Sequence, residues 1–212
     1  AINIARGLQL SGASVVILDT DRQGSARDWN TANNGELIPV LGLDRATIDK
    51  DIKSIKGFDV AIIDGAPQLK EMAVSCVKIS DYVLIPIQPS QLDIWATSDL
   101  IELIQERQAV FTKPKTAFII CRQIAGTKAQ KELREILDNT GFKVFDNGTF
   151  QRMDYINSIA NGKTVFETKG KAKEEMINIV NELMEFVKLL RKGSEGKPIG
   201  IKICIGNKSE FL

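Results

Sequence analysis

The sequence contains no histidine, and this absence narrows the chemistry open to the protein. Without histidine there can be no serine or cysteine triad built on an imidazole, no histidine general base and little zinc chemistry. Any catalysis must therefore use carboxylates, amides, lysines or arginines.

Cysteine is also scarce, with three residues that lie far apart in the chain, Cys76, Cys121 and Cys204. Their spacing fits neither a metal site nor a redox pair, and an odd number does not make a closed disulfide framework. We interpret them as small core residues of a cytoplasmic protein.

Long apolar runs are missing as well. No stretch approaches the roughly 20 residues that cross a bilayer, and no secretory signal pattern opens the chain, so a soluble protein is expected. The 28 basic and 27 acidic residues leave a net charge of +1, so any affinity for DNA must come from a local patch. The richest candidates, which equally suit a solvated helix face, are Lys169, Lys171, Lys173, Lys188, Arg191 and Lys192.

Apolar runs typical of buried parallel strands alternate with helical patterns along the chain. Strands are expected at 14–19, 37–42, 58–64, 82–89, 116–122 and 142–146, with helices at 1–10, 25–32, 44–55, 70–79, 93–108 and 127–139 and two closing helices, the last at 171–192. This alternation predicts one α/β domain with a doubly wound, mostly parallel sheet and helices on both faces.

The two ends of the chain depart from this pattern. The sequence opens on a helical pattern without an initiating Met, so we expect the true N-terminus upstream. We place the domain at residues 1–192 and interpret 193–212 as a tail, either an incidental, possibly non-native extension or one exposed strand built on alternating isoleucines. Deleting that tail is expected to change the thermal midpoint little.

Aspartates follow three of the predicted strands. Asp19 and Asp21 end the first, Asp64 ends the third, and Asp93 opens the helix after the fourth. Ligands bind beyond the carboxyl ends of parallel strands, and carboxylates there suit a magnesium ion on nucleotide phosphates. Asp93 by itself fits a helix N-cap equally well.

Four segments in order resemble the ParA/MinD group of deviant phosphate-loop ATPases. They are SGASVVILDTDRQGSARDW, FDVAIIDGAP, DYVLIPIQPSQLDIWA and FQRMDYINSIANGKTVFE, and together they extend the likeness over roughly residues 1–190, closest to small plasmid-partitioning ParA proteins. Two departures stand out. Arg22 replaces the usual Pro, and the glycine-rich phosphate loop with its lysines and first strand would precede Ala1.

The resemblance implies an ATPase that uses ATP and Mg²⁺. By this likeness Asp21 would position or activate the attacking water, Asp19 would support the magnesium shell, and Asp64 would hold the ion through water. The further residues expected at the nucleotide or partner-subunit site are Asp93, Arg122, Gln151 and Arg152. The chain alone, without that loop, is expected to bind nucleotide poorly.

Three functions remain open on the sequence. The first is a nucleoid-associated DNA-segregation switch, in which ATP closes a homodimer that binds DNA without sequence preference and a centromere-binding ParB-like adaptor stimulates hydrolysis. The second is a MinD-like ATPase that positions cargo or acts at a membrane, although no membrane-binding helix is evident at the C-terminus. The third is a non-catalytic interaction module with the same fold.

Overall fold

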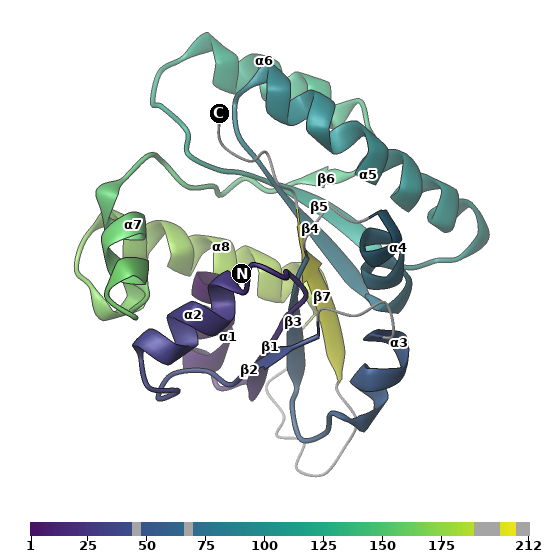
Figure 1. Cartoon of the computed structure of the whole chain (residues 1–212). Coiled ribbons are helices and arrows are strands. Elements are labelled where there is room, and N and C mark those ends of the chain that lie inside the picture. The colour runs from purple at the N-terminus through teal and green to yellow at the C-terminus, as the bar shows by residue number, and fades with distance from the viewer. Residues whose placement is uncertain (44–47, 66–69, 189–199, 207–212) are drawn as a thin grey trace.

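Seven parallel strands form one sheet with helices on both faces in the computed structural model, which describes residues 1–43, 48–65, 70–188 and 200–206 (Figure 1). The strands lie in the order β2-β1-β3-β7-β4-β5-β6. Their bounds are β1 Val15–Asp19, β2 Val40–Gly42, β3 Val60–Asp64, β4 Tyr82–Ile87, β5 Lys115–Ile120, β6 Lys143–Val144 and β7 Ile201–Ile205. The helices are α1 Ile2–Leu10, α2 Ser25–Ala32, α3 Ile48–Asp51, α4 Lys70–Ile79, α5 Gln91–Val110, α6 Lys128–Asp138, α7 Met153–Ala160 and α8 Lys171–Val187, with 3₁₀ turns η1 Ile52–Ser54 and η2 Val165–Glu167.

Alternate residues of each central strand enter two separate hydrophobic clusters. Val15 and Ile17 of β1 pack in one cluster with α1 and α8, whereas Val16 and Leu18 pack in the other with α3 and α4. A strand that helices cover on both faces has a nearly continuous run of apolar residues in its sequence, because the side chains on either face pack against a helix. The predicted doubly wound sheet is therefore confirmed, and all its strand pairs are parallel.

The amphipathic stripe predicted for the last helix is confirmed in α8. Its buried positions include Met176, Ile179, Val180, Leu183 and Val187. Helix α1 lies close against it, because a Cβ on Gly7 would stand only 2.5 Å from Val180 Cγ2. The predicted continuation of this helix to residue 192 lies outside the described residues.

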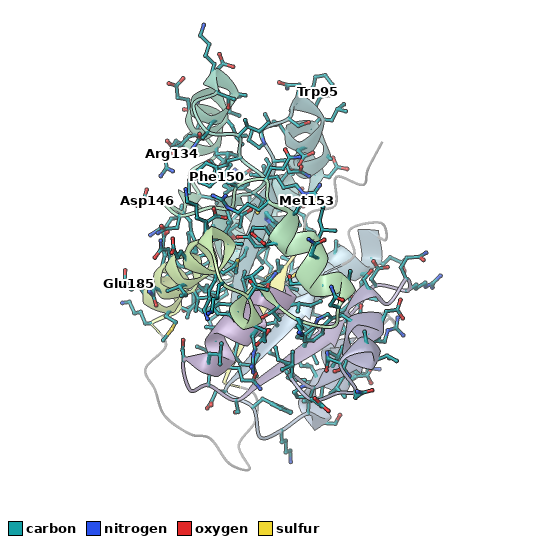
Figure 2. All side chains as sticks on the ribbon, turned by 90° about the vertical axis from the view of Figure 1, so that its left-hand side faces the viewer. Trp95, Arg134, Asp146, Phe150, Met153 and Glu185 are labelled. Carbon is teal, nitrogen blue, oxygen red and sulfur yellow. The ribbon has the colours of Figure 1, made fainter. Side chains whose placement is uncertain are left out.

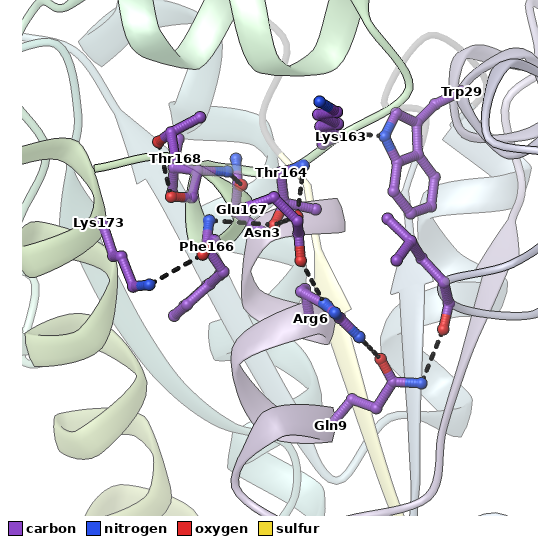
Figure 3. Close-up of polar contacts among 12 residues, drawn as sticks. Asn3, Arg6, Gln9, Trp29, Lys163, Thr164, Phe166, Glu167, Thr168 and Lys173 are labelled. Carbon is purple, nitrogen blue, oxygen red and sulfur yellow. Dashed lines mark hydrogen bonds and ion pairs between the residues drawn. The ribbon is translucent and has the colours of Figure 1, made fainter. Parts of the chain in front are cut away.

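The segment that connects α7 to α8 binds the first two helices, α1 and α2 (Figure 3). Trp29 Nε1 of α2 donates to the carbonyl of Lys163 at 3.0 Å, and Arg6 Nε of α1 meets Glu167 Oε1 at 2.8 Å. Glu167 also accepts from the backbone N–H of Thr164 and so closes a capping box on η2. These contacts join residues more than 130 positions apart in sequence.

The described isoleucines of the alternating set, Ile201, Ile203 and Ile205, do not form an exposed strand, which corrects our interpretation of that segment. They lie in β7 in the middle of the sheet, with Ile203 in register with Ile62 of β3 and Tyr82 of β4 (Figure 1). Ile203 and Ile205 pack in one cluster and Cys204 in the other. Lys202, the charged residue between these isoleucines, is ion-paired, with its Nζ 2.9 Å from Asp81 Oδ2.

Two predicted strands are much shorter than expected, and one predicted helix is described only in part. Strand β2 begins at Val40, since Pro39 has no N–H to donate to a ladder. The helix expected over 44–55 is described only as α3 and η1, and 44–47 lie outside the described residues. Strand β6 covers two residues, Lys143 and Val144, at the edge of the sheet.

Truncating the buried Ile203 side chain should destabilise the whole sheet. Ile203→Ala is expected to cost about 2–5 kcal/mol of unfolding free energy, because it leaves a cavity between the sheet and the helices on one of its faces. The thermal midpoint should fall by about 5 °C or more in a chain of this size. Ile177→Ala, at a side chain 39% exposed on α8, is the control and should shift it little. Equal shifts in calorimetry would show that β7 is not docked as described.

Candidate functional site

Two of the predicted aspartates meet at the carboxyl edge of the sheet. Asp19 and Asp64 are register partners on β1 and β3, and Ile205 of β7 is the next partner along the same row. The loop after β1 is tied to β3 as well, because Thr20 donates its N–H and its hydroxyl to the carbonyl of Asp64. The strand ends are thereby held in a fixed relation.

A cavity of about 200 Å³ opens above this row. Asp19, Asp21 and Asp64 line it together with Gly206 after β7 and Ala1, which precedes the first turn of α1. The remaining lining residues are Ser25, Gly65, Pro86 and Ile205. Carboxylates and the N-terminal end of a helix thus share one small space, and a helix N-terminus favours an anionic group.

The Asp19 side chain is 1% exposed and is bound by protein donors. Its Oδ1 accepts from the N–H of Asp21 at 3.1 Å, and its Oδ2 accepts from Arg27 N at 3.2 Å and Arg27 Nε at 3.3 Å. These contacts satisfy a buried carboxylate, which would otherwise be costly. They also hold the turn that carries Asp21.

Asp21 and Asp64 are the carboxylates best placed toward the cavity. Both are half-buried, and Asp21 Oδ1 accepts from the N–H of Gln23 at 3.0 Å. Within the described part of the chain, no three acidic, cysteine or histidine side chains converge as a complete metal site. Two oxygen-bearing side chains still fit magnesium, because that ion keeps several waters and takes one or two carboxylates.

A larger cavity of about 1140 Å³ adjoins the first, since Ser25 and Pro86 line both. Its wall includes all four of the other predicted site residues, Asp93, Arg122, Gln151 and Arg152. It also includes Gln88, Cys121, Gln123, Ile124, Ala125, Thr149, Phe150, Met153, Tyr155 and Ile156. The fold therefore brings the predicted residues to one continuous edge, in two adjoining cavities.

Asp93 has a local structural role in this wall. Its side chain is buried at 5% exposure, and Oδ2 accepts from the N–H of Gln88 at 2.9 Å. The bond ties the end of β4 to the first turn of α5. Asp93 is therefore not the helix N-cap, which is Ser90, and its carboxylate binds the turn between β4 and α5 instead.

Arg152 is bound by a carboxylate that the sequence reasoning did not single out. Its Nε lies 2.6 Å from Glu175 Oε1 of α8, while Glu175 Oε2 accepts from Tyr155 Oη at 2.9 Å and from Phe150 N at 3.2 Å. Burial, followed by the hydrogen bond to Glu175, raises the pKa of Tyr155 and keeps the phenol protonated. This network fixes the wall of the large cavity on the last helix.

The mouth of the large cavity carries exposed apolar side chains. Met153 and Ile156 of α7 are 63% and 53% exposed, and Ile124 after β5 is 59% exposed. Leu92 and Trp95, on the first turns of α5, are also exposed but do not line this cavity, and Figure 2 shows Trp95 apart from Met153. Exposed apolar groups gathered around a pocket are typical of an interaction surface.

Arg27 and Glu175 are the two site residues that sequence reasoning missed. Arg27 stands eight residues after Asp19, within the first segment quoted for the family resemblance, but its residue type gives no sign of this role. Glu175 stands 23 residues after Arg152, and no short motif links those two. Cys76 and Cys204 likewise come together, although they are distant in sequence. The hydrogen bond between the two thiols, followed by burial, raises the pKa of Cys204.

Comparison with known proteins agrees with this architecture. A family model for an AAA domain matches residues 32–117. The maintenance of carboxysome distribution protein A of Halothiobacillus neapolitanus is 28% identical over 191 residues, covering 86% of this chain and 88% of that protein.

Solved structures share the fold over most of the chain. The MinD cell division protein of Aquifex aeolicus matches with a TM-score of 0.61 at 15% identity, covering 86% of this chain and 89% of that one. A putative plasmid partition protein of Borrelia burgdorferi, bound to AMPPNP, matches with a TM-score of 0.63 at 20% identity, covering 86% and 91%. The chain shares its fold with these MinD and plasmid-partition proteins. Within the described residues, no helix is both long and apolar enough to span a membrane.

Removing the Glu175 carboxylate should loosen the wall of the large cavity. Glu175→Ala leaves Arg152 Nε and the N–H of Phe150 without this acceptor, while the Tyr155 hydroxyl keeps only the carbonyl of Ala172, so the unfolding free energy should fall by about 1–3 kcal/mol. Glu174→Ala, at the exposed neighbouring position, should stay within about 0.5 kcal/mol of the unaltered protein. Denaturant titration measures both, and similar values for the two variants would contradict the role given to Glu175.

Proposed function

We propose that this ParA/MinD relative is an ATPase that switches with its bound nucleotide and distributes a large cargo. The observation that carries the proposal is the cavity where Asp21 and Asp64 meet beside the first turn of α1. Clustered carboxylates need a cation, and a helix N-terminus attracts an anion. A magnesium-bound nucleotide phosphate supplies both charges.

We assign each aspartate a role in this chemistry according to its position at the cavity. A magnesium ion would neutralise charge on the phosphates, with Asp64 as the carboxylate that holds it through water. Asp21, at the same cavity, would orient the attacking water. Asp19, already bound to Arg27, would support the site by fixing the turn rather than by a direct contact with the ion.

The adjoining cavity offers room for the rest of a nucleotide. Its volume of about 1140 Å³ exceeds what a small ligand needs, and its wall carries Arg122, Gln151 and exposed Met153 and Ile156. Exposed apolar side chains at the mouth suit a second copy of the chain. A homodimer closed on ATP is therefore part of the proposal.

The nature of the cargo separates two versions of this function. A partition role, with non-specific DNA, a ParB-like adaptor and a nucleoid-associated cytoplasmic location, is supported by the fold shared with a plasmid partition protein. A role in positioning a protein cargo is supported by the relative named for carboxysome distribution. We place the DNA-segregation role first and cargo positioning second.

The basic residues give the DNA-binding version limited support. Lys169 and Lys171 lie at the start of α8 and Lys188 at its end, about 25 Å away at 1.5 Å per residue over 17 residues. Lys173 Nζ donates to the carbonyl of Phe166 at 2.9 Å (Figure 3). Arg191 and Lys192 lie outside the described residues. Those described do not form one patch, so DNA binding needs a direct test.

Substituting the two cavity aspartates should separate binding from turnover. In a complete chain that carries the phosphate loop, Asp21→Ala is expected to bind ATP normally and to lose turnover by about 100-fold or more, as for a residue that handles the attacking water. Asp64→Ala should weaken the magnesium-dependent part of ATP binding. Phosphate release and nucleotide affinity with and without Mg²⁺ measure the two effects.

Asp28→Ala provides the matched control for these variants, because Asp28 is an exposed carboxylate on α2. It should leave both measurements near those of the unaltered protein. Turnover close to that of the unaltered protein in both cavity variants would remove the catalytic assignment.

The salt dependence of DNA binding should distinguish the DNA-segregation version of the function from the positioning of a protein cargo. In the DNA-segregation version, the ATP-bound protein binds unrelated duplexes alike, with affinity falling by about a hundredfold or more between roughly 50 and 200 mM salt. Fluorescence anisotropy with two unrelated duplexes measures this. Absence of binding with ATP, or affinity insensitive to salt, would count against DNA segregation and favour the positioning of a protein cargo.

A further inference from the structure

Arg27 lies beneath the turn that carries Asp21 and binds it from several sides. Its N–H and Nε both donate to Asp19 Oδ2, at 3.2 and 3.3 Å. Its Nη2 donates to the carbonyl of Asp21 at 2.7 Å and to that of Arg22 at 3.4 Å. One guanidinium thus contacts both a buried carboxylate and two main-chain carbonyls of the following turn.

Two glycines make the space for this guanidinium. A Cβ on Gly24 would lie 2.9 Å from Arg27 Nε and Nη2, and a Cβ on Gly42 would lie 3.1 Å from Arg27 Cδ. Gly24 has a φ of 70°, a conformation that favours glycine in any case. Gly42 has no such backbone requirement, so its close approach to Arg27 is what a larger residue there would disturb.

We propose that Arg27 is a positioning residue that holds Asp21 toward the small cavity. The inference rests on the proposed ATPase function, in which Asp21 orients the attacking water. Asp19 Oδ1 accepts from the N–H of Asp21, so the Arg27–Asp19 pair fixes both the N–H and the C=O of Asp21. With both ends of its backbone held, the direction of the Asp21 side chain is set before any ligand binds.

The fork of the guanidinium matters as much as its charge. Arginine presents several donors in a fixed plane, whereas lysine presents one compact ammonium group. Lysine at position 27 would keep a positive charge near Asp19 but could not reach Asp19 and the Asp21 carbonyl with the same geometry. A role limited to charge neutralisation would tolerate this exchange, and a positioning role would not.

The test compares R27M and R27K with R134M. Arg134 is the matched control, because its side chain is 39% exposed against 37% for Arg27 and it also pairs with an aspartate. Amide hydrogen exchange at Asp21 and Gln23 reports the turn, and steady-state kinetics report kcat and KM for ATP.

In R27M, exchange at these two amides should accelerate by about tenfold or more, as expected when hydrogen bonds to a charged group are lost. The kcat should fall by about 100-fold with KM little changed, because the loss is one of orientation. R27K should recover only part of either effect, and R134M should show neither.

G42A gives a second route to the same result, since it crowds Arg27 without removing it. It should accelerate the same amides and lower kcat in the same direction, which keeps the test decisive if R27M does not fold. Exchange in R27M and G42A equal to that in R134M would overturn the proposal, and so would faster exchange with an unchanged kcat.

The outcome also separates this proposal from the proposed function. A complete chain that carries the phosphate loop and hydrolyses no ATP would overturn the ATPase function and, with it, the part of Arg27 in turnover. The amide exchange data need no nucleotide, so they would still decide whether Arg27 fixes the turn that carries Asp21.

Discussion

The pairing of β7 with β3 on one side and β4 on the other is the interaction on which the rest of the sheet depends. Within the described residues, no ladder joins β3 directly to β4, so β7 connects the β2-β1-β3 half to the β4-β5-β6 half. Its side chains also enter both hydrophobic clusters. A strand from the end of the sequence thus links the two halves of the sheet and the helix layers on its two faces.

The candidate site depends on the same strand. Because parallel strands end at one edge, the row that contains Asp19 and Asp64 continues through Ile205, and Gly206 lines the small cavity above it. The large cavity lies beyond, at the ends of β4 and β5, and its wall is fixed by Glu175 of α8. The rigid sheet therefore brings together groups that come from the first, middle and last parts of the chain.

The functional interpretation depends on which partners bind the charged side chains at the carboxyl edge of the sheet. Asp19 is bound by Arg27 and Arg152 by Glu175, so these two predicted site residues hold the structure around the cavities. Asp21 and Asp64 remain the carboxylates whose position suits a magnesium-bound phosphate. A buried ion pair is a weak source of stability but a good means of fixing geometry, which is the use proposed for Arg27.

The sequence by itself determined the fold class, most helices and strands, and the edge at which the aspartates gather. It could do so because these features follow from local periodicity and from the rule that parallel strands end together. Only the tertiary structure decided the place of β7. The alternation Ile-Lys-Ile-Cys-Ile is typical of an exposed strand, but Lys202 is paired with Asp81 and the strand lies in the middle of the sheet. The same holds for the partner of Arg152, because Glu175 is brought to it by packing between elements that are distant in sequence. It also holds for the partner of Asp19, because no periodicity indicates that Arg27, on the next helix, directs its guanidinium back to the end of β1.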